Sequence, residues 1–485
     1  MEQIILPPFA PTLIESTRAI GYSLETAVAD IIDNSIAAYA TKVDLFFFPV
    51  DGEYIAFLDN GIGMNEEEIN IAMQYGSKSP LEKRDSNDLG RFGLGLKTAS
   101  LSQCKSLTVV SKRGSQLFGR RWDVDYVAET GDWTLLVLNS EDMESCPHFE
   151  ELMKYESGTL VIWQHLDRLK AGELDFEQAL GRKMDAVRKH LALVFHRYLA
   201  GETGIKKLRL TINGQNVEPV DPFMTGKSNQ AIDDEVLLVH GEKIRVRPYI
   251  LPHTSKMTAE ELEQAGGKEG LRRQQGFYVY RNKRLLAWGT WFRMMRQGEM
   301  SKLVRIRVDI PNALDDLWTL DIKKSSALPP AEVRNSLRNI IDRMAEKSKR
   351  TWTTRGKKEV SDDYVHIWNR MKTRTGGYLY ELNREYPLIA ELLSSSDCSG
   401  KLESVLRQIE RNIPLNSLFV DLTNDAKIDN ESELDLKEVL ESVKEILNNA
   451  DPAVREPLLN NLIMCEPFSS YGNEIMQAYD KGKLS

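Results

Sequence analysis

Apolar positions recur at three- and four-residue spacing from Leu24 to Tyr39, and this period predicts a helix packed along one side. On the opposite side, Asp30 and Asn34 stand four residues apart, so they project from one face a single turn from each other. A carboxylate and an amide placed in this way can address one ligand. A solvated helix face has the same appearance, so this pair alone decides nothing.

A second polar segment follows an apolar run, residues 53–58, that predicts a strand. The segment runs from Asp59 to Met64, and its glycines, Gly61 and Gly63, let the backbone turn sharply and let a ligand approach without meeting a Cβ. Asp59 offers an acceptor at the strand end. Asn65 with a glutamate three residues later forms a variant capping box, which predicts a new helix from about Glu66.

The third segment is a glycine-rich loop that runs into a helix: Gly90, Arg91, Phe92, Gly93, Leu94, Gly95, Leu96 and Lys97. Backbone N–H groups and a helix N-terminus suit phosphate oxygens, and Lys97 lies one turn into the helix. A P-loop is excluded because Leu96 separates Gly95 from Lys97. A dinucleotide fingerprint is also excluded, because the three glycines are spaced GxxGxG instead of GxGxxG.

In this order, the three segments resemble the motifs of the GHKL ATPase superfamily, which includes gyrase, MutL, heat-shock chaperones, histidine kinases and MORC proteins. A fourth motif fits Ser157-Gly158-Thr159, which opens an apolar strand. The sequence looks most like prokaryotic MORC-like or MutL-like ATPases. The resemblance implies an α/β fold: an N-terminal GHKL (Bergerat) α/β sandwich with helices on one face of a mixed sheet, followed by a transducer-like α/β domain and a helical C-terminal region.

The resemblance also implies two cofactors, ATP and Mg²⁺, and a role for each motif. Asn34 would be the metal ligand, Asp59 would accept from the adenine amino group with support from Thr159, and Asp30 would be the catalytic base. The implied nucleotide-binding set is Asp33, Asn34, Asp59, Gly61, Gly63, Met64, Gly90, Arg91, Phe92, Gly93, Leu94, Gly95, Leu96, Lys97 and Thr159.

Asp30 departs from the pattern, because most hydrolysing relatives have glutamate at this position. Aspartate is one methylene shorter, so the base would stand farther from the attacking water and hydrolysis would be slow. Asp33, three residues along the same helix, would assist or merely orient. A pocket that binds ATP as a scaffold, with little hydrolysis, remains an alternative.

Periodicity divides the rest of the chain. Apolar residues at helical spacing predict a long helix over residues 173–198, and alternating strands follow between about 208 and 310. The expected organisation is an N-terminal arm (1–22), the ATPase domain (23–172), a connecting helix (173–204), the transducer-like domain (205–348), a basic linker (349–376) and a helical interaction region (377–485).

Two segments are expected to complete the nucleotide site. The polar stretch 77–89 lies where relatives carry a lid over the nucleotide. In relatives the transducer sends a lysine to the γ-phosphate, and Leu320–Ser326 is the candidate strand and loop here. Alternation places Lys324 on a face with Leu320 and Ile322, which favours Lys324 as the catalytic lysine, although Lys323 remains an alternative.

Composition restricts the compartment and the partners. The net charge is −9, so any nucleic-acid contact must be local, and residues 347–374 reverse the charge with cations interleaved by aromatic residues. This basic segment suits DNA, but a solvated linker looks similar. The four cysteines are scattered, which argues for a reducing compartment and against zinc. We expect a cytoplasmic chain without a membrane segment.

These features together favour an ATPase that forms a homodimer on binding ATP and acts as a clamp or switch, either on DNA or in a repair or defence assembly linked to DNA. A chaperone-like ATPase that acts on protein clients is an alternative. A histidine kinase is disfavoured because none of the seven histidines precedes the first motif. The C-terminal helices are expected to bind protein partners of unknown identity.

Overall fold

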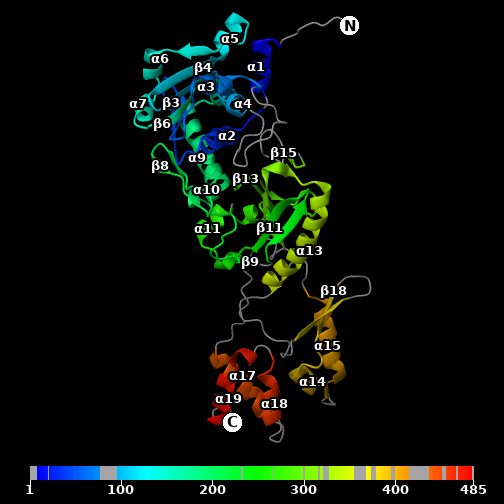
Figure 1. Ribbon diagram of the computed structural model, residues 1–485. Coiled ribbons are helices and arrows are strands. Elements are labelled where there is room, and N and C mark those ends of the chain that lie inside the picture. Colours follow the sequence, from blue (N-terminus) through cyan, green and yellow to red (C-terminus); the bar gives the residue numbers. More distant parts are fainter. Residues whose placement is uncertain are drawn as a thin grey trace, which may run out of the picture. The chain divides into compact units, whose positions relative to one another are not determined.

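The computed structural model describes most of the chain: residues 8–19, 21–76, 95–230, 233–265, 267–298, 301–314, 317–320, 327–353, 367–372, 378–394, 399–413, 436–449, 455–465 and 468–482. The chain divides into two compact units, Met1–Thr353 and Thr354–Ser485. Figure 1 shows the first unit with its two sheets and the second with its small hairpin and helices.

The first sheet has eight strands in the described residues, in the order β5 (Leu136–Leu138), β4 (Gln116–Asp123), β3 (Ser106–Arg113), β6 (Ser157–Gln164), β2 (Tyr54–Asp59), β1 (Lys42–Phe48), β7 (Arg209–Ile212) and β8 (Gln215–Asn216). Neighbours are antiparallel except β1 and β7. Strands β1 and β2 form a hairpin across Asp51-Gly52. Strand β4 was not predicted.

The strand near residue 208 was expected to open the second domain, and this assignment is wrong. Lys42 to Leu45 of β1 pair in parallel with Arg209 to Ile212 of β7, so the strand extends the first sheet. The backbone N–H of Arg209 donates to Thr41 O at 2.8 Å, which starts this pairing. The first sheet is therefore completed only after the chain has left the long helix.

Helices cover both faces of the first sheet, whereas we expected them on one. One face packs against α1 (Ala10–Arg18), α2 (Leu24–Ala37), α4 (Gly95–Leu101) and α9 (Phe176–Val194), and its core includes Phe57. The other face packs against the short helices α6 (Ser140–Glu144) and α7 (Phe149–Met153) around Ala56 and Leu58. Alternate residues of β2 point into opposite cores because successive side chains of a strand face opposite ways.

Local signals fix where the helices begin. Ser23 caps α2 and accepts from the Thr26 N–H, while Asn65 and Glu68 form the predicted capping box of α3 (Glu66–Met73). The remaining helices of this region are α5 (Val124–Thr130), α8 (Asp167–Lys170) and α10 (His196–Ala200). The single helix expected over 173–198 is interrupted at Phe195, between α9 and α10.

The second sheet runs β10 (Glu235–Val239), β11 (Glu242–Ile250), β14 (Val304–Ile310), β12 (Gly276–Arg281) and β13 (Arg284–Thr290), and β9 (Asn229–Gln230) pairs with β11. Helix α13 (Ala331–Thr353) covers one face through Val333, Leu337 and Ile340. The connections hold α11 (Ala259–Gln264) and α12 (Gly267–Arg273), short 3₁₀ turns at Thr254–Lys256 and Asn312–Leu314, and the paired strands β15 (Thr319–Leu320) and β16 (Ala327–Leu328).

The opposite face of the second sheet belongs to the core of the first. Phe223, Tyr249, Tyr278 and Tyr280 lie in the same buried cluster as the residues of α2 and α9. His196 of α10 is hydrogen-bonded to the Tyr280 hydroxyl at 2.8 Å, and Arg197 forms an ion pair with Asp309. The two sheets are therefore joined by a continuous buried contact, and a displacement of one is felt by the other.

The second unit contains β17 (Trp368–Lys372), β18 (Tyr378–Leu382), α14 (Pro387–Ser394), α15 (Ser399–Arg411), α17 (Leu436–Asn449), α18 (Arg455–Leu462), a 3₁₀ turn at Phe468–Tyr471, and α19 (Gly472–Asp480). The region is largely helical, as predicted. The helical region expected over 377–485 is wrong at its start, because Tyr378–Leu382 pairs with Trp368–Lys372 as a hairpin. Among the described residues, none of the helices is both long and apolar enough to span a membrane.

Candidate nucleotide site

Helix α2 brings two carboxylates and an amide to one end of the first sheet. Asp30 and Asp33 are 5% and 2% exposed, whereas Asn34 is exposed. The helix is buried along most of its length, so its acidic residues are held inside the domain instead of on a solvated face. A carboxylate is rarely buried unless other groups compensate its charge, so Asp30 and Asp33 do not belong to a solvated surface.

The carboxylate of Asp59 lies at the end of β2, against α2. It accepts from the Ser35 hydroxyl at 2.8 Å and from the Gly61 N–H at 2.8 Å. Burial raises the pKa of Asp59, while the hydrogen bonds from Gly61, Ser35 and Thr159 oppose that rise. The side chain is thus fixed in one orientation by neighbours from two elements, as a hydrogen-bond acceptor for a ligand must be.

The loop after β2 approaches the neighbouring strands too closely for side chains. A Cβ on Gly63, whose φ is +64°, would lie 2.0 Å from Lys112 O, and a Cβ on Gly61 would lie 2.8 Å from Ala38 O. The Met64 N–H donates to the Ser111 hydroxyl at 2.9 Å, and Ser111 is hydrogen-bonded to the Thr159 hydroxyl at 3.0 Å.

Thr159 stands directly opposite Asp59 in the register of β6 and β2. The loop after Asp59 and the Ser157-Gly158-Thr159 motif are therefore connected through this small network, and Ser35 ties Asp59 to α2. Ser35 and Ser111 were not singled out in the sequence, since a lone serine within an apolar helix or strand carries no distinguishing pattern.

Helix α4 places the end of the glycine-rich segment beside α2. A Cβ on Gly95 would lie 3.7 Å from Asp30 Oδ2, so the N-terminus of α4 faces the carboxylate expected to act as base. Leu96 is half-buried against the main core. The other predicted residues of this loop, Gly90, Arg91, Phe92, Gly93 and Leu94, lie outside the described residues, as do the lid 77–89 and the transducer lysines Lys323 and Lys324.

Lys97 is 1% exposed, and its ammonium donates to Ala72 O at 2.9 Å. The Trp122 indole N–H donates to the next carbonyl, Met73 O, at 2.8 Å. A cation at the C-terminal end of α3 is stabilised by the helix dipole, so Lys97 joins α4 to α3 in this structure. Burial lowers the pKa of Lys97 to about 8.

A buried ion pair ties α2 to the second sheet. Arg284 Nε, at the start of β13, lies 3.3 Å from Asp33 Oδ1, and the two side chains are 5% and 2% exposed. The guanidinium also lies over the Phe195 ring, 5.4 Å from its centroid. Sequence reasoning missed Arg284, because an arginine after a turn is ordinarily solvated and its partner lies 251 residues away.

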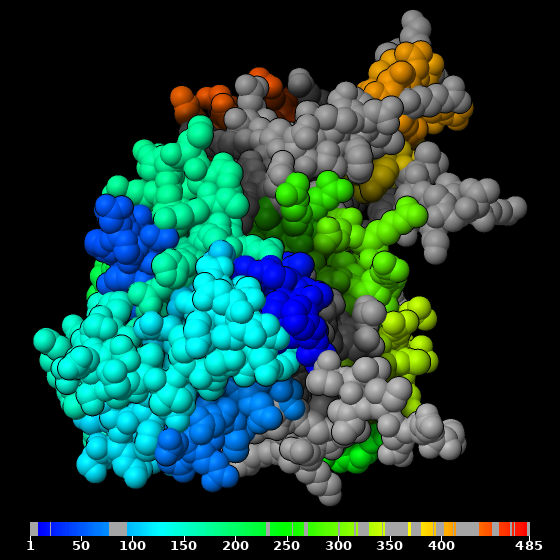
Figure 2. Space-filling view, turned by 90° about the horizontal axis from the view of Figure 1, so that it is seen from above, coloured from blue at the N-terminus to red at the C-terminus, as the bar shows by residue number. Residues whose placement is uncertain are grey.

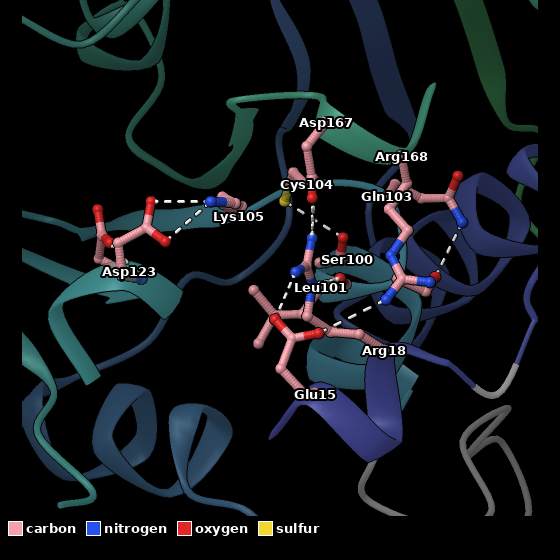
Figure 3. Close-up of polar contacts among 12 residues, drawn as sticks. Glu15, Arg18, Ser100, Leu101, Gln103, Cys104, Lys105, Asp123, Asp167 and Arg168 are labelled. Carbon is pink, nitrogen blue, oxygen red and sulfur yellow. Dashed lines mark hydrogen bonds and ion pairs between the residues drawn. The ribbon is translucent and has the colours of Figure 1, made fainter. Parts of the chain in front are cut away.

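The N-terminal helix α1 is fastened to the far end of α4. Arg18 Nε donates to Leu101 O at 2.8 Å, and its Nη2 donates to both carboxylate oxygens of Asp167 at 2.7 Å. Figure 3 shows this cluster together with Glu15, which pairs with the same guanidinium. In Figure 2 the dark blue segment of α1 lies against the cyan segment of α5, which it contacts.

The donor set of α2 fits Mg²⁺. Asn34 presents an amide oxygen next to two carboxylates, and Mg²⁺ takes hard oxygen ligands together with waters and phosphate oxygens. Within the part of the chain that the structure describes, there is no group of three His, Cys, Asp or Glu side chains that could hold a metal. A magnesium ion at Asn34 would be held in common with a bound polyphosphate, since one amide oxygen supplies only one of its ligands.

Residues 22–159 match the family described as histidine kinase-, DNA gyrase B- and HSP90-like ATPase. The matched region contains α2, the Asp59 loop, α4 and Thr159.

Three curated relatives are similar over short stretches. The mouse ATPase MORC2B is 34% identical over 91 residues (18% of this chain, 9% of the relative), and the mouse mismatch repair endonuclease PMS2 is 32% identical over 106 residues (21% and 12%). The MutL mismatch repair protein of Rickettsia akari is 27% identical over 89 residues (18% and 15%). The matches thus span less than a sixth of each relative's length.

Among solved structures, the N-terminal domain of a DNA repair protein is similar at 16% identity. The alignment covers 70% of this chain and 98% of that one, with a TM-score of 0.42.

Proposed function

We propose that the chain binds ATP with Mg²⁺ and hydrolyses it slowly, from the premise that residues 22–159 form a GHKL-type ATPase domain and that the chain is similar over short stretches to MORC and MutL proteins. The observation that carries the proposal is the approach of Gly95 to Asp30. It brings the end of the glycine-rich segment and the acidic face of α2 to one place, at the end of β2 that holds Asp59.

Each side chain has a role that its surroundings support. Asp59, fixed by Ser35 and the Gly61 N–H, accepts a hydrogen bond from the adenine amino group. Asn34 provides the protein oxygen for Mg²⁺, which when bound neutralises phosphate charge. Asp30 orients water and takes its proton. Gly95 leaves room for the phosphates beside Asp30. Gly61 and Gly63 keep residues 60–64, the loop after Asp59 that we call the adenine loop, closely packed against the sheet.

Lys97 has two roles open to it. In this structure its ammonium is bonded to Ala72 O and contributes to the packing of α4 on α3. We propose that it stabilises phosphate charge mainly by holding α4 in place, with direct contact requiring a change of rotamer. Lys324 is proposed, by resemblance, as the transducer lysine that reaches the γ-phosphate.

We further propose that ATP binding pairs two copies of the chain into a clamp, with hydrolysis as the reset, and that the clamp works in an assembly linked to DNA. Two of the relatives are mismatch repair proteins by name, which supports the link to DNA. The basic segment 347–374 is the proposed DNA contact, and the helices of the second unit are the proposed docking sites for protein partners.

Isothermal titration with a nonhydrolysable ATP analogue and Mg²⁺ tests the nucleotide site. The wild-type chain should bind, and Asn34→Ala should weaken Mg²⁺-dependent binding by about tenfold or more. Asn460→Ala, which changes an exposed helical asparagine of α18, is the matched control and should bind as the wild type does. An equal affinity of all three proteins would refute the assignment of Asn34.

Sedimentation and DNA binding test the clamp. The analogue should shift the wild-type chain from monomer to dimer, and Asn34→Ala should stay monomeric at the same concentration. DNA affinity should fall steeply with salt, since phosphate contacts release counterions. A nucleotide-dependent dimer that binds no DNA would favour the chaperone-like alternative.

A further inference from the structure

The metal-binding turn of α2 is held from the second sheet. Asp33 immediately precedes Asn34 and lies one turn after Asp30, so a contact that holds its side chain also restrains the turn of α2 that carries both neighbours. Its carboxylate is paired with Arg284 at 3.3 Å, in surroundings where both groups are almost fully buried. A buried ion pair is costly to break, because removing one partner leaves a charge in a medium that solvates it poorly.

Arg284 lies on a hairpin that is itself hydrogen-bonded to α10 and to the loop that follows α10. The turn between β12 and β13 carries Asn282 and Lys283 at φ of 47° and 65°, a tight hairpin conformation. The Tyr198 hydroxyl donates to Asn282 O at 2.6 Å, and the Lys283 ammonium donates to Thr203 O at 2.6 Å. The hairpin end therefore has little freedom relative to α10.

The surroundings of Arg284 are also closely packed. Its Nη1 donates to Leu285 O at 2.5 Å, and its guanidinium lies over the Phe195 ring at the break between α9 and α10. Five residues before Phe195, on α9, His190 lies against Trp288 of β13, with 5.8 Å between the ring centroids. Arg284 therefore contacts the second sheet, the break between α9 and α10, and helix α2.

From this geometry we infer that Arg284 is a positioning residue for the nucleotide site: through its ion pair with Asp33 it fixes the turn of α2 that carries Asn34 and Asp30, so that the second sheet and the Mg²⁺–nucleotide site influence each other. The role of the site rests on the proposed function, whereas the connection between α2 and β13 rests on the described contacts alone. Because coupling between sites is reciprocal, nucleotide binding at α2 should in turn restrain the hairpin.

The test compares two cations of the second sheet. Arg284→Met removes the charge that faces Asp33, while Lys243→Met removes an exposed charge of β11. Hydrogen exchange of α2 is measured first, without nucleotide, on the full chain. We expect α2 amides to exchange about tenfold faster in Arg284→Met and at the wild-type rate in Lys243→Met.

The second measurement is nucleotide affinity as a function of Mg²⁺ concentration. Arg284→Met should need about tenfold more Mg²⁺ for half-maximal binding of the ATP analogue, and Arg284→Lys should restore part of the affinity. A merely structural role would lower the melting temperature and leave the Mg²⁺ dependence unchanged. Arg284→Lys also serves as the variant of choice if Arg284→Met does not fold, since it retains a charge opposite Asp33.

The two proposals fail separately. Unchanged α2 exchange in both Arg284→Met and Arg284→Lys would overturn the connection, whether or not the chain binds nucleotide. Faster α2 exchange together with an unshifted Mg²⁺ dependence would overturn the positioning role. A wild-type chain that binds no nucleotide would overturn the proposed function, and with it the positioning role, while the exchange measurement would still decide whether Arg284 holds α2.

Discussion

Arg18 on α1 and Asp167 at the start of α8 form a partly buried ion pair, in which one guanidinium nitrogen donates to both carboxylate oxygens at 2.7 Å. The same guanidinium donates to Leu101 O at the C-terminal end of α4. A residue from the beginning of the chain therefore closes the end of the helix whose other end faces Asp30. The Arg18 side chain is 2% exposed and that of Asp167 is 34% exposed.

Replacement of Arg18 by methionine should destabilise the first unit by about 2 kcal/mol, less than for a fully buried pair, since the remaining Asp167 carboxylate reaches water. Urea unfolding followed by circular dichroism measures the change. The neighbouring Arg168 is 40% exposed and stands 3.6 Å from Glu15, so Arg168→Met should cost less than about 0.5 kcal/mol. Equal losses in the two variants would contradict this account of the Arg18 pair.

Changes at Asp30 should separate binding from hydrolysis. Asp30→Asn keeps the shape and removes the base, so kcat should fall by about a hundredfold while the affinity for the ATP analogue changes little. Asp30→Glu should raise kcat, since the longer side chain brings the carboxylate nearer to the water. Glu25→Gln, in the first turn of the same helix, is the control and should leave kcat within about twofold of the wild type. A full loss of analogue binding in Asp30→Asn would count against a role confined to catalysis.

Asp59→Asn should weaken ATP binding by about tenfold to a hundredfold. The amide can turn an N–H toward the adenine amino group, which then loses its acceptor. Titration calorimetry with the analogue measures the affinity. Asp44→Asn is the comparison, because Asp44 is also buried in the first sheet but its carboxylate accepts from Thr211 and pairs with the Lys42 ammonium. The assignment of Asp59 fails if both variants bind alike.

Two glycines with positive φ allow the close packing of the adenine loop to be measured. Gly52, at φ +80°, has open space where a Cβ would go, so Gly52→Ala should cost only the backbone strain of about 1 kcal/mol. Gly63, at φ +64°, faces Lys112 O at 2.0 Å from the Cβ position, so Gly63→Ala should add a further 1–3 kcal/mol or so. Thermal unfolding of the two variants gives the difference, and identical melting temperatures would show that the loop yields freely.

Acid should destabilise the first unit in part through His190. Burial, with the nearby Arg284 charge, lowers the pKa of His190 to about 3, and its buried Nε2 has no hydrogen-bond partner among the residues that the structure describes. In the unfolded chain His190 takes up a proton near pH 6.5, whereas in the folded chain it stays neutral until much lower pH. The free energy of unfolding therefore falls as the pH drops below about 6.5. Between about pH 7 and pH 5 the loss from this residue should be about 1–2 kcal/mol.

His190→Gln should remove that part of the pH dependence. Urea unfolding at several pH values, with wild type and variant compared at each, isolates the histidine from the carboxylates, which titrate in both proteins. Parallel stability curves down to about pH 4 would show that His190 is protonated in the folded state without cost.

Short-range patterns predicted the parts of the site that are local. The stripe of α2, the turn after β2 and the Asn65 cap depend on residues a few positions apart, and the structure has all three. Tyr378–Leu382 was predicted wrongly because a short apolar run has no period that separates a strand from a helix. The break at Phe195 was missed for a similar reason, since the apolar stripe runs on through it.

Short-range patterns could not predict contacts between segments that are far apart in the sequence. Nothing near Arg209 distinguishes a strand that pairs with β1 from one that opens a second sheet. Likewise Lys97, predicted to hold phosphates, is bonded to Ala72 O, a carbonyl whose availability depends on where α3 ends. The Asp33–Arg284 pair depends on the docking of the two sheets. Motif spacing predicts which residues belong to the nucleotide site, and tertiary packing decides how they are held.

The parallel pairing of β7 with β1 has a practical consequence for anyone dividing this chain into fragments. A recombinant ATPase domain ended at about residue 204 would strip the outer strand from β1 and leave its N–H and C=O groups bare, an edge prone to self-association. Extending the fragment through Asn216 retains β8 as the natural border of the sheet.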